Sequence, residues 1–138
     1  MKRRIRWVPE SAVRSLHAEL IAEHGGSSGI RDAGLLASAL IRPRNRRIYG
    51  TPSTLFDLAA MYGVAIVRNH PFIDGNKRVA LMVIYVFLEI NGYRLNAPEV
   101  ETADVMLRLA SGEMDDKDLS GWLEANSAPF RLRGQASE

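Results

Sequence analysis

The chain has 138 residues, of which 46% are hydrophobic and 25% charged, with a formal net charge of +2, as expected for one soluble domain with its own core. It contains no cysteine, which excludes disulfides and thiolate metal sites. No apolar run approaches the roughly 20 residues that cross a bilayer, and the basic start lacks a secretion signal's apolar stretch, so we expect a cytoplasmic protein without a membrane span.

The first part of the chain predicts two helices separated by a glycine-rich loop. Pro9 suits the start of a helix that runs to about His24, and its histidines, His17 and His24, are expected at the surface or at the helix end. The glycines of residues 25–29 end this helix and begin a loop that is either a mobile flap or a plain connector. Asp32 caps a second helix over residues 33–41.

Pro43 is expected to stop the second helix, with a polar loop following to about residue 52. This stretch holds a cluster of arginines, which is a feature of nucleic-acid interfaces. It lacks the interleaved aromatic side chains on which bases stack. We therefore do not expect nucleic acid to be a partner.

Two apolar segments follow, over residues 54–69 and 76–91, and each is hydrophobic on most sides, as a central helix is. Two shorter helices are expected from Pro98 to Gly112 and from about residue 116 to 126. The predicted fold class is all-α, a bundle around two central apolar helices within a single domain of residues 1–126. Residues 127–138 are polar without periodicity, and we expect a disordered tail.

The two central segments are joined by a motif that concentrates polar residues, His70-Pro71-Phe72-Ile73-Asp74-Gly75-Asn76-Lys77-Arg78. Pro71 bars a continuous helix, and Asp74-Gly75 is typical of a turn. Lys77 and Arg78 then fall in the first turn of a helix, where the exposed N–H groups and the helix dipole favour negative charge. A phosphate ligand at this helix start would resolve the conflict, although both cations could also be solvated.

The motif resembles the signature of the Fic/Doc superfamily, and Lys77 is typical of its Doc (death-on-curing) toxin branch. Further similarities cover nearly the whole chain, including the flap at residues 25–32. AMP-transferring members of the superfamily have glycine in place of Lys77 and a second arginine in place of Leu81. The resemblance implies the Fic/Doc helical fold and a nucleotide held differently from that of the AMP-transferring members.

The resemblance also implies an activity and partners. Doc-type toxins are protein kinases that transfer the γ-phosphoryl group of ATP to a threonine of elongation factor Tu and so inhibit translation. They are neutralised by a cognate Phd-like antitoxin whose disordered tail folds on the toxin surface. We therefore expect a toxin of a toxin–antitoxin system, with ATP and Mg²⁺ as cofactors and a translation factor as substrate.

Roles for the motif residues follow from phosphoryl-transfer chemistry, which depends mainly on positioning and charge neutralisation. His70 would take the proton of the attacking hydroxyl, because histidine changes protonation near neutral pH. Asp74 would hold Mg²⁺ against the phosphates, although it could instead only cap the helix. The remaining candidates would bind the phosphate groups: Arg68, Gly75, Asn76, Lys77 and Arg78.

Two other functions remain open at this stage. The first is a Fic-type nucleotidyl transferase that attaches AMP to a protein hydroxyl. The second is a protein-binding module that has lost catalysis. Labelled ATP separates the first from a kinase, and the effect of replacing His70 separates the second from any enzyme.

Overall fold

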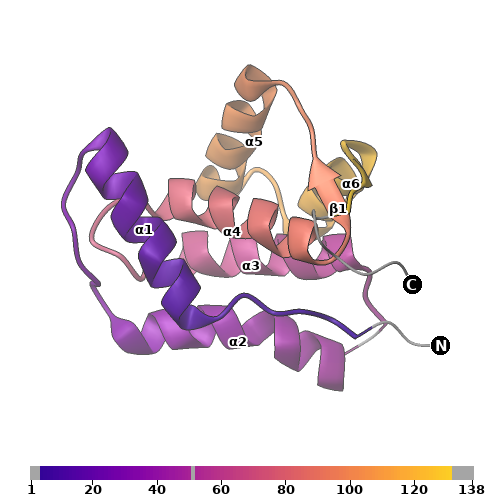
Figure 1. The fold of residues 1–138 in the computed structure, drawn as a ribbon, viewed down its shortest axis with the longest axis horizontal. Helices are drawn as coiled ribbons and strands as arrows, with labels where there is room; N and C mark the ends of the chain where they lie inside the picture. Colours follow the sequence, from indigo (N-terminus) through magenta and orange to yellow (C-terminus); the bar gives the residue numbers. More distant parts are fainter. Residues whose placement is uncertain (1–3, 51, 132–138) are drawn as a thin grey trace.

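The computed structural model describes residues 4–50 and 52–131, and this part of the chain is mostly helical (Figure 1). The helices are α1 (Glu10–His24), α2 (Ala33–Tyr49), α3 (Leu55–Asn69), α4 (Asn76–Ile90), α5 (Glu99–Ser111) and α6 (Asp116–Ala125). Two short strands, β1 (Tyr93–Leu95) and β2 (Ser127–Pro129), form an antiparallel pair. The all-α prediction is confirmed. No helix in the described ranges has the length and apolar character required to span a membrane.

Helices α3 and α4 form the centre of the molecule, with α1, α2, α5 and α6 around them (Figure 1). Their buried side chains are almost all apolar, as the two hydrophobic segments predict. Gly63 allows the two helices to approach closely, because a Cβ atom there would lie 2.7 Å from Cδ1 of Ile84. The predicted pair of central helices is therefore observed, and the loop between them is fixed at both ends.

Helix α2 continues past Pro43 to Tyr49, so the predicted stop at Pro43 and the predicted polar loop are wrong over this stretch. A proline inside a helix removes one main-chain hydrogen bond. Pro43, however, is buried on the same face as Leu36 and Ala39, the face of α2 that meets the core beside α3. Tertiary packing outweighs this local cost. Helix propensity alone does not take such packing into account.

The chain after residue 126 also differs from the prediction of a disordered tail. Strand β2 pairs with β1, with Ser127 opposite Leu95. The Phe130 N–H then donates to the Gly92 carbonyl at 2.8 Å, and the Arg94 guanidinium lies 3.7 Å from the centre of the Phe130 ring. The predicted tail is thus paired with β1 over its first residues, while residues 132–138 lie outside the described part. A strand of three residues is too short to show a hydrophobic pattern.

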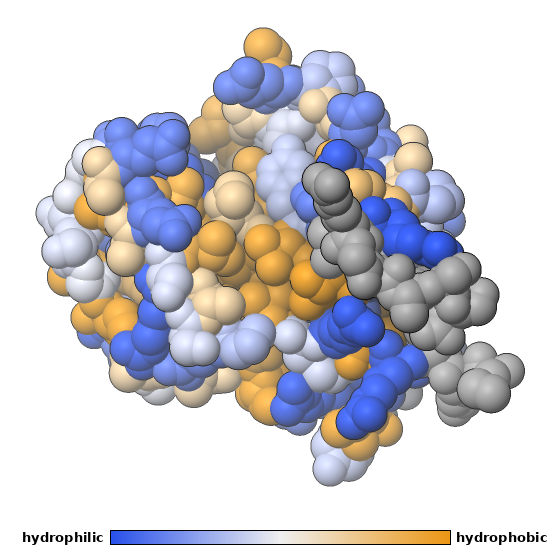
Figure 2. All heavy atoms as spheres, viewed as in Figure 1, coloured by the Kyte–Doolittle hydropathy of each residue, from blue (hydrophilic) through white to orange (hydrophobic). Residues whose placement is uncertain are grey.

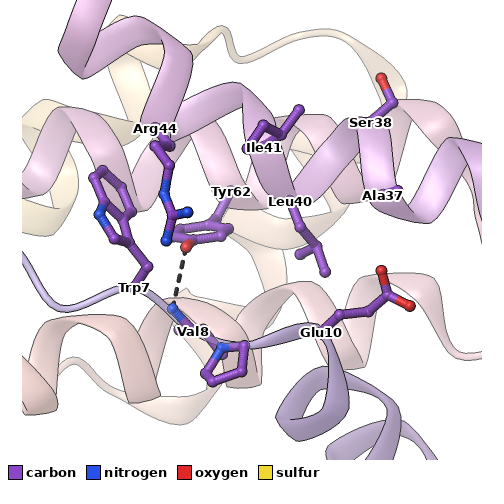
Figure 3. Close-up of a pocket in the computed structure, with 10 residues that line it drawn as sticks. Trp7, Val8, Glu10, Ala37, Ser38, Leu40, Ile41, Arg44 and Tyr62 are labelled. Atoms are coloured by element: carbon purple, nitrogen blue, oxygen red, sulfur yellow. Dashed lines mark hydrogen bonds between the residues drawn. The ribbon is translucent and has the colours of Figure 1, made fainter.

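The segment before α1, residues 4–9, lies along α2 and covers part of the core. The Val8 N–H donates to the hydroxyl of the buried Tyr62 at 3.2 Å, and burial raises the pKa of that hydroxyl (Figure 3). Beside this contact runs an open groove of about 570 Å³ between the segment and α2, with Arg44 above the Trp7 ring. The motif loop does not contribute to this groove, which therefore lies apart from the candidate site.

Candidate active site

The motif loop, residues 70–75, joins α3 to α4 and begins in an unusual backbone conformation. His70 has φ 49° and ψ 55°, and it is the one non-glycine residue with positive φ in the described ranges. The left-handed conformation costs roughly 1–2 kcal/mol for a residue with a Cβ atom. Such a conformation persists only where the surroundings hold it, and it is most frequent at functional sites.

Arg31 holds His70 in this conformation. Its Nε donates to the His70 carbonyl at 2.7 Å, and its Nη2 donates to the Asn69 carbonyl at 2.9 Å. Both carbonyls belong to the end of α3, where unpaired acceptors and the negative end of the helix dipole favour a cation. The His70 side chain is exposed, so its ring is available to a substrate while its backbone is fixed.

The rest of the flap, residues 25–32, lies against the motif loop. The N–H groups of Arg31 and Asp32 donate to the Pro71 carbonyl at 2.7 and 3.1 Å, and the Ile73 N–H donates to the Gly29 carbonyl at 3.2 Å. Ile30 and Phe72 form an antiparallel bridge between the two segments. Of the two readings of the glycine-rich stretch, the structure supports a flap beside the site, and its mobility stays a prediction.

The Asn76 side chain, predicted to bind phosphate, is engaged within the loop itself. Its side chain is 5% exposed, and both of its polar atoms are used within the loop. Oδ1 accepts from the Phe72 N–H and Nδ2 donates to the Phe72 carbonyl, each at 3.0 Å. A buried loop must satisfy its peptide groups, and Asn76 does this for Phe72. Only its main-chain N–H, at the start of α4, is left for a ligand.

Asp74 is exposed at the junction of the flap and α4. Its Oδ1 accepts from the Gly75 N–H at 2.9 Å and its Oδ2 accepts from the Ser27 N–H at 3.3 Å. Gly26 is required for this approach, because a Cβ atom there would lie 2.7 Å from Oδ2 of Asp74 and its φ is +112°. Each carboxylate oxygen has two lone pairs, so both keep acceptor capacity for a cation.

The start of α4 carries two cationic side chains that form no ion pair within the described residues. The residue before the helix is Gly75, which offers no side-chain cap, and the first turn contains no acidic residue. Lys77 and Arg78 are exposed, and within residues 4–50 and 52–131 neither makes a hydrogen bond or ion pair. In contrast, α6 starts with a capping box of Asp115 and Asp118. The start of α4 is thus the place where an anion would be stabilised.

Arg68 lies in the last turn of α3, two residues before His70, and its side chain is exposed. The structure shows it in a position where a cation also stabilises the helix end. Its predicted contact with a nucleotide stays a prediction.

His17 was expected at the surface, and this is wrong. It is 4% exposed, and its Nε2 lies 2.7 Å from the Asp74 carbonyl oxygen. Its ring stacks on Phe72 with 3.9 Å between centroids and 11° between planes. The one available signal was its spacing: His17 follows the buried Val13 by one helical turn, which places both on the inner face of α1.

These observations define a class of site: an exposed histidine in a strained loop, followed by a helix start that is open to an anion.

The family model described as Fic/DOC family matches residues 7–88. The chain is 36% identical over 129 residues to Protein kinase doc of Escherichia phage P1, covering 93% of this chain and 95% of that protein. It is 40% identical over 95 residues to Toxin Doc of Mycolicibacterium smegmatis, covering 66% and 72% respectively. The chain belongs to the Fic/DOC family.

Proposed function

We propose that this protein is a Doc-type toxin that acts as a protein kinase, transferring the γ-phosphoryl group of ATP to a threonine or serine hydroxyl of another protein. The observation that carries the proposal is the start of α4, which follows the loop that begins at His70 and where Lys77 and Arg78 make no ion pair within the described residues. The similarity along almost the whole length of a relative named as a protein kinase supports the same activity.

The chain's own residues would divide the work as follows. His70 accepts the proton of the substrate hydroxyl, whose oxygen then forms a bond to the γ-phosphorus. The bond between that phosphorus and the β,γ-bridging oxygen breaks, and ADP leaves with the electron pair. Lys77, Arg78 and the N–H groups of the α4 start neutralise the charge on the phosphate oxygens, which is the main catalytic contribution in reactions of this type.

The geometry of Asp74 fits a role in holding Mg²⁺. Mg²⁺ is usually held by one or two carboxylates together with substrate phosphates and water. Asp74 is exposed, and it lies beside the proposed phosphate position at the start of α4. The described residues contain no cluster of three or more ligating side chains, so the nucleotide would supply further ligands. Bound Mg²⁺ would neutralise charge on the phosphates.

The side chain at position 81 supports a kinase rather than an AMP transferase. Leu81 is partly buried and packs against the hydrophobic core. It therefore places no cation at the position where AMP-transferring relatives carry their second arginine. This departure supports γ-phosphoryl transfer over AMP transfer.

By the same resemblance we propose elongation factor Tu as the substrate, with inhibition of translation as the result. We also propose a Phd-like antitoxin as the partner that controls the protein. Figure 2 shows hydrophobic side chains over the central helices, on the face between α1 and β1, and a folding antitoxin tail would cover such a face. A neighbouring small open reading frame that encodes a DNA-binding protein would support this pairing.

Transfer of label from ATP tests the activity. The protein is incubated with elongation factor Tu and with ATP labelled at either the γ- or the α-phosphate. We expect the γ-label on the substrate and no α-label. Transfer of the α-label alone would establish nucleotidyl transfer instead. Absence of both labels, together with unchanged toxicity of His70→Ala, would favour a binding module.

A further inference from the structure

His17 on α1 contacts the carbonyl of Asp74, the residue that we propose as a Mg²⁺ ligand. This carbonyl belongs to the peptide bond between Asp74 and Gly75. The carbonyl acceptor requires a hydrogen on Nε2, so the ring is the Nε2-protonated tautomer or the imidazolium. On the other side of the same peptide, the Gly75 N–H donates to Oδ1 of Asp74 at 2.9 Å. The carbonyl and the N–H of a trans peptide lie in one plane and point in opposite directions. By fixing the carbonyl, His17 therefore also fixes the N–H that orients the Asp74 carboxylate.

The His17 ring itself has little freedom to move. It stacks on Phe72, which is 1% exposed and whose own peptide groups are bonded to the Asn76 side chain. A Cβ atom added at Gly75 would lie 3.6 Å from Nε2 of His17, so a side chain at this turn would touch the ring. Gly75 has φ +78°, a left-handed conformation that glycine adopts at little cost.

We propose that His17 is a positioning residue that aims the Asp74 carboxylate at the divalent cation of the bound nucleotide. This inference rests on the proposed function, because it takes Asp74 as a Mg²⁺ ligand. Partners that orient a metal ligand typically change metal affinity by 10–100-fold when they are removed. His17 would act in this way without touching the cation or the substrate.

The test separates the hydrogen bond from the packing. His17→Phe keeps a ring that can stack on Phe72 but has no donor, whereas His17→Gln keeps an N–H donor but not the ring. Mg²⁺ affinity is measured by titration in the presence of a non-hydrolysable ATP analogue, without catalysis. We expect His17→Phe to weaken Mg²⁺ binding roughly 10-fold and His17→Gln to retain affinity within about threefold. Equal affinity of wild type and His17→Phe would overturn the proposal.

Two further measurements keep the result interpretable. Amide hydrogen exchange of Gly75, measured by NMR without metal, should be faster in His17→Phe than in His17→Gln; equal rates would contradict the proposed geometry. Asp74→Asn tests the underlying role: if it leaves Mg²⁺ affinity unchanged, the metal function of Asp74 fails and the inference with it. If Asp74→Asn weakens binding and His17→Phe does not, only the positioning role of His17 fails.

Discussion

In helices α3 and α4, the buried side chains are almost all apolar and pack against the surrounding helices. In the motif loop, by contrast, several main-chain groups are held by polar partners from distant parts of the chain. The carbonyls of His70 and Asp74 are bonded to Arg31 and His17, which are 39 and 57 residues away in the sequence. The core depends on apolar area, which many sequences can supply. The loop depends on individual hydrogen bonds, so replacing one partner removes a contact that no other residue supplies.

Replacement of His70 by alanine should have the largest effect on activity. If His70 is the general base, the rate of phosphoryl transfer should fall by roughly 10²–10⁴-fold. The side chain is exposed, so the thermal melting temperature should change little. The matched control is His24→Ala, which removes another exposed histidine and should leave the rate unchanged. Equal rates for His70→Ala and wild type would exclude general-base catalysis.

Replacement of Phe87 by alanine should show the opposite pattern. Phe87 is 0% exposed and packs against Tyr62 and Trp7, so truncation should lower the free energy of unfolding by about 3–5 kcal/mol. The rate per folded molecule should change much less than in His70→Ala. Urea denaturation measures the first effect, with the exposed Val100→Ala as control. A loss below about 1 kcal/mol would show that α4 is not central to the core.

Replacement of Arg31 should affect the loop without affecting the core. Arg31→Ala removes both donors to the end of α3, and we expect the rate to fall at least on the order of 10-fold, because each hydrogen bond to a charged group contributes about 1.5–3 kcal/mol. Arg31→Lys keeps the charge but not the two-pronged geometry, so it should restore only part of the rate. Arg14→Ala removes an exposed arginine elsewhere and is the control. An unaltered rate in Arg31→Ala would show that Arg31 is not needed to hold His70 in its active position.

The smallest effect concerns stability in acid. Burial alone would raise the pKa of Asp57, but hydrogen bonds from Ser120 and Thr54 and the charge of Arg46 lower it below the ordinary value of 3.8. A lowered pKa in the folded state stabilises the protein above the ordinary value, and this contribution disappears as the pH falls below it.

Asp57→Asn should therefore be less stable at neutral pH by roughly 1 kcal/mol, the usual net value of a hydrogen bond. It should also lose less stability than wild type when the pH falls from 5 to 3. Thermal melts across this range measure both effects, with the exposed Asp104→Asn as control. Parallel pH profiles for Asp57→Asn and wild type would contradict a lowered pKa of Asp57 in the folded protein.

The sequence predicts those features that repeat or that break a local rule. The apolar pattern of residues 54–69 and 76–91 predicts α3 and α4, and the cations at residues 77 and 78 stand out because a helix start disfavours them. The sequence does not predict contacts that form only in the folded chain. Pro43 is tolerated because α2 packs on the core, and His17 reaches the motif loop only after folding.

The most direct test of the account is nucleotide binding at the start of α4. Isothermal titration with Mg²⁺ and a non-hydrolysable ATP analogue compares wild type with Lys77→Ala/Arg78→Ala. Lys117→Ala is the control, because Lys117 also lies in the first turn of a helix, where aspartates surround it. We predict at least about 10-fold weaker binding in the double variant and none of this loss in Lys117→Ala, since hydrogen bonds to charged groups contribute about 1.5–3 kcal/mol. Equal affinity of the double variant and wild type would contradict a phosphate site at this helix.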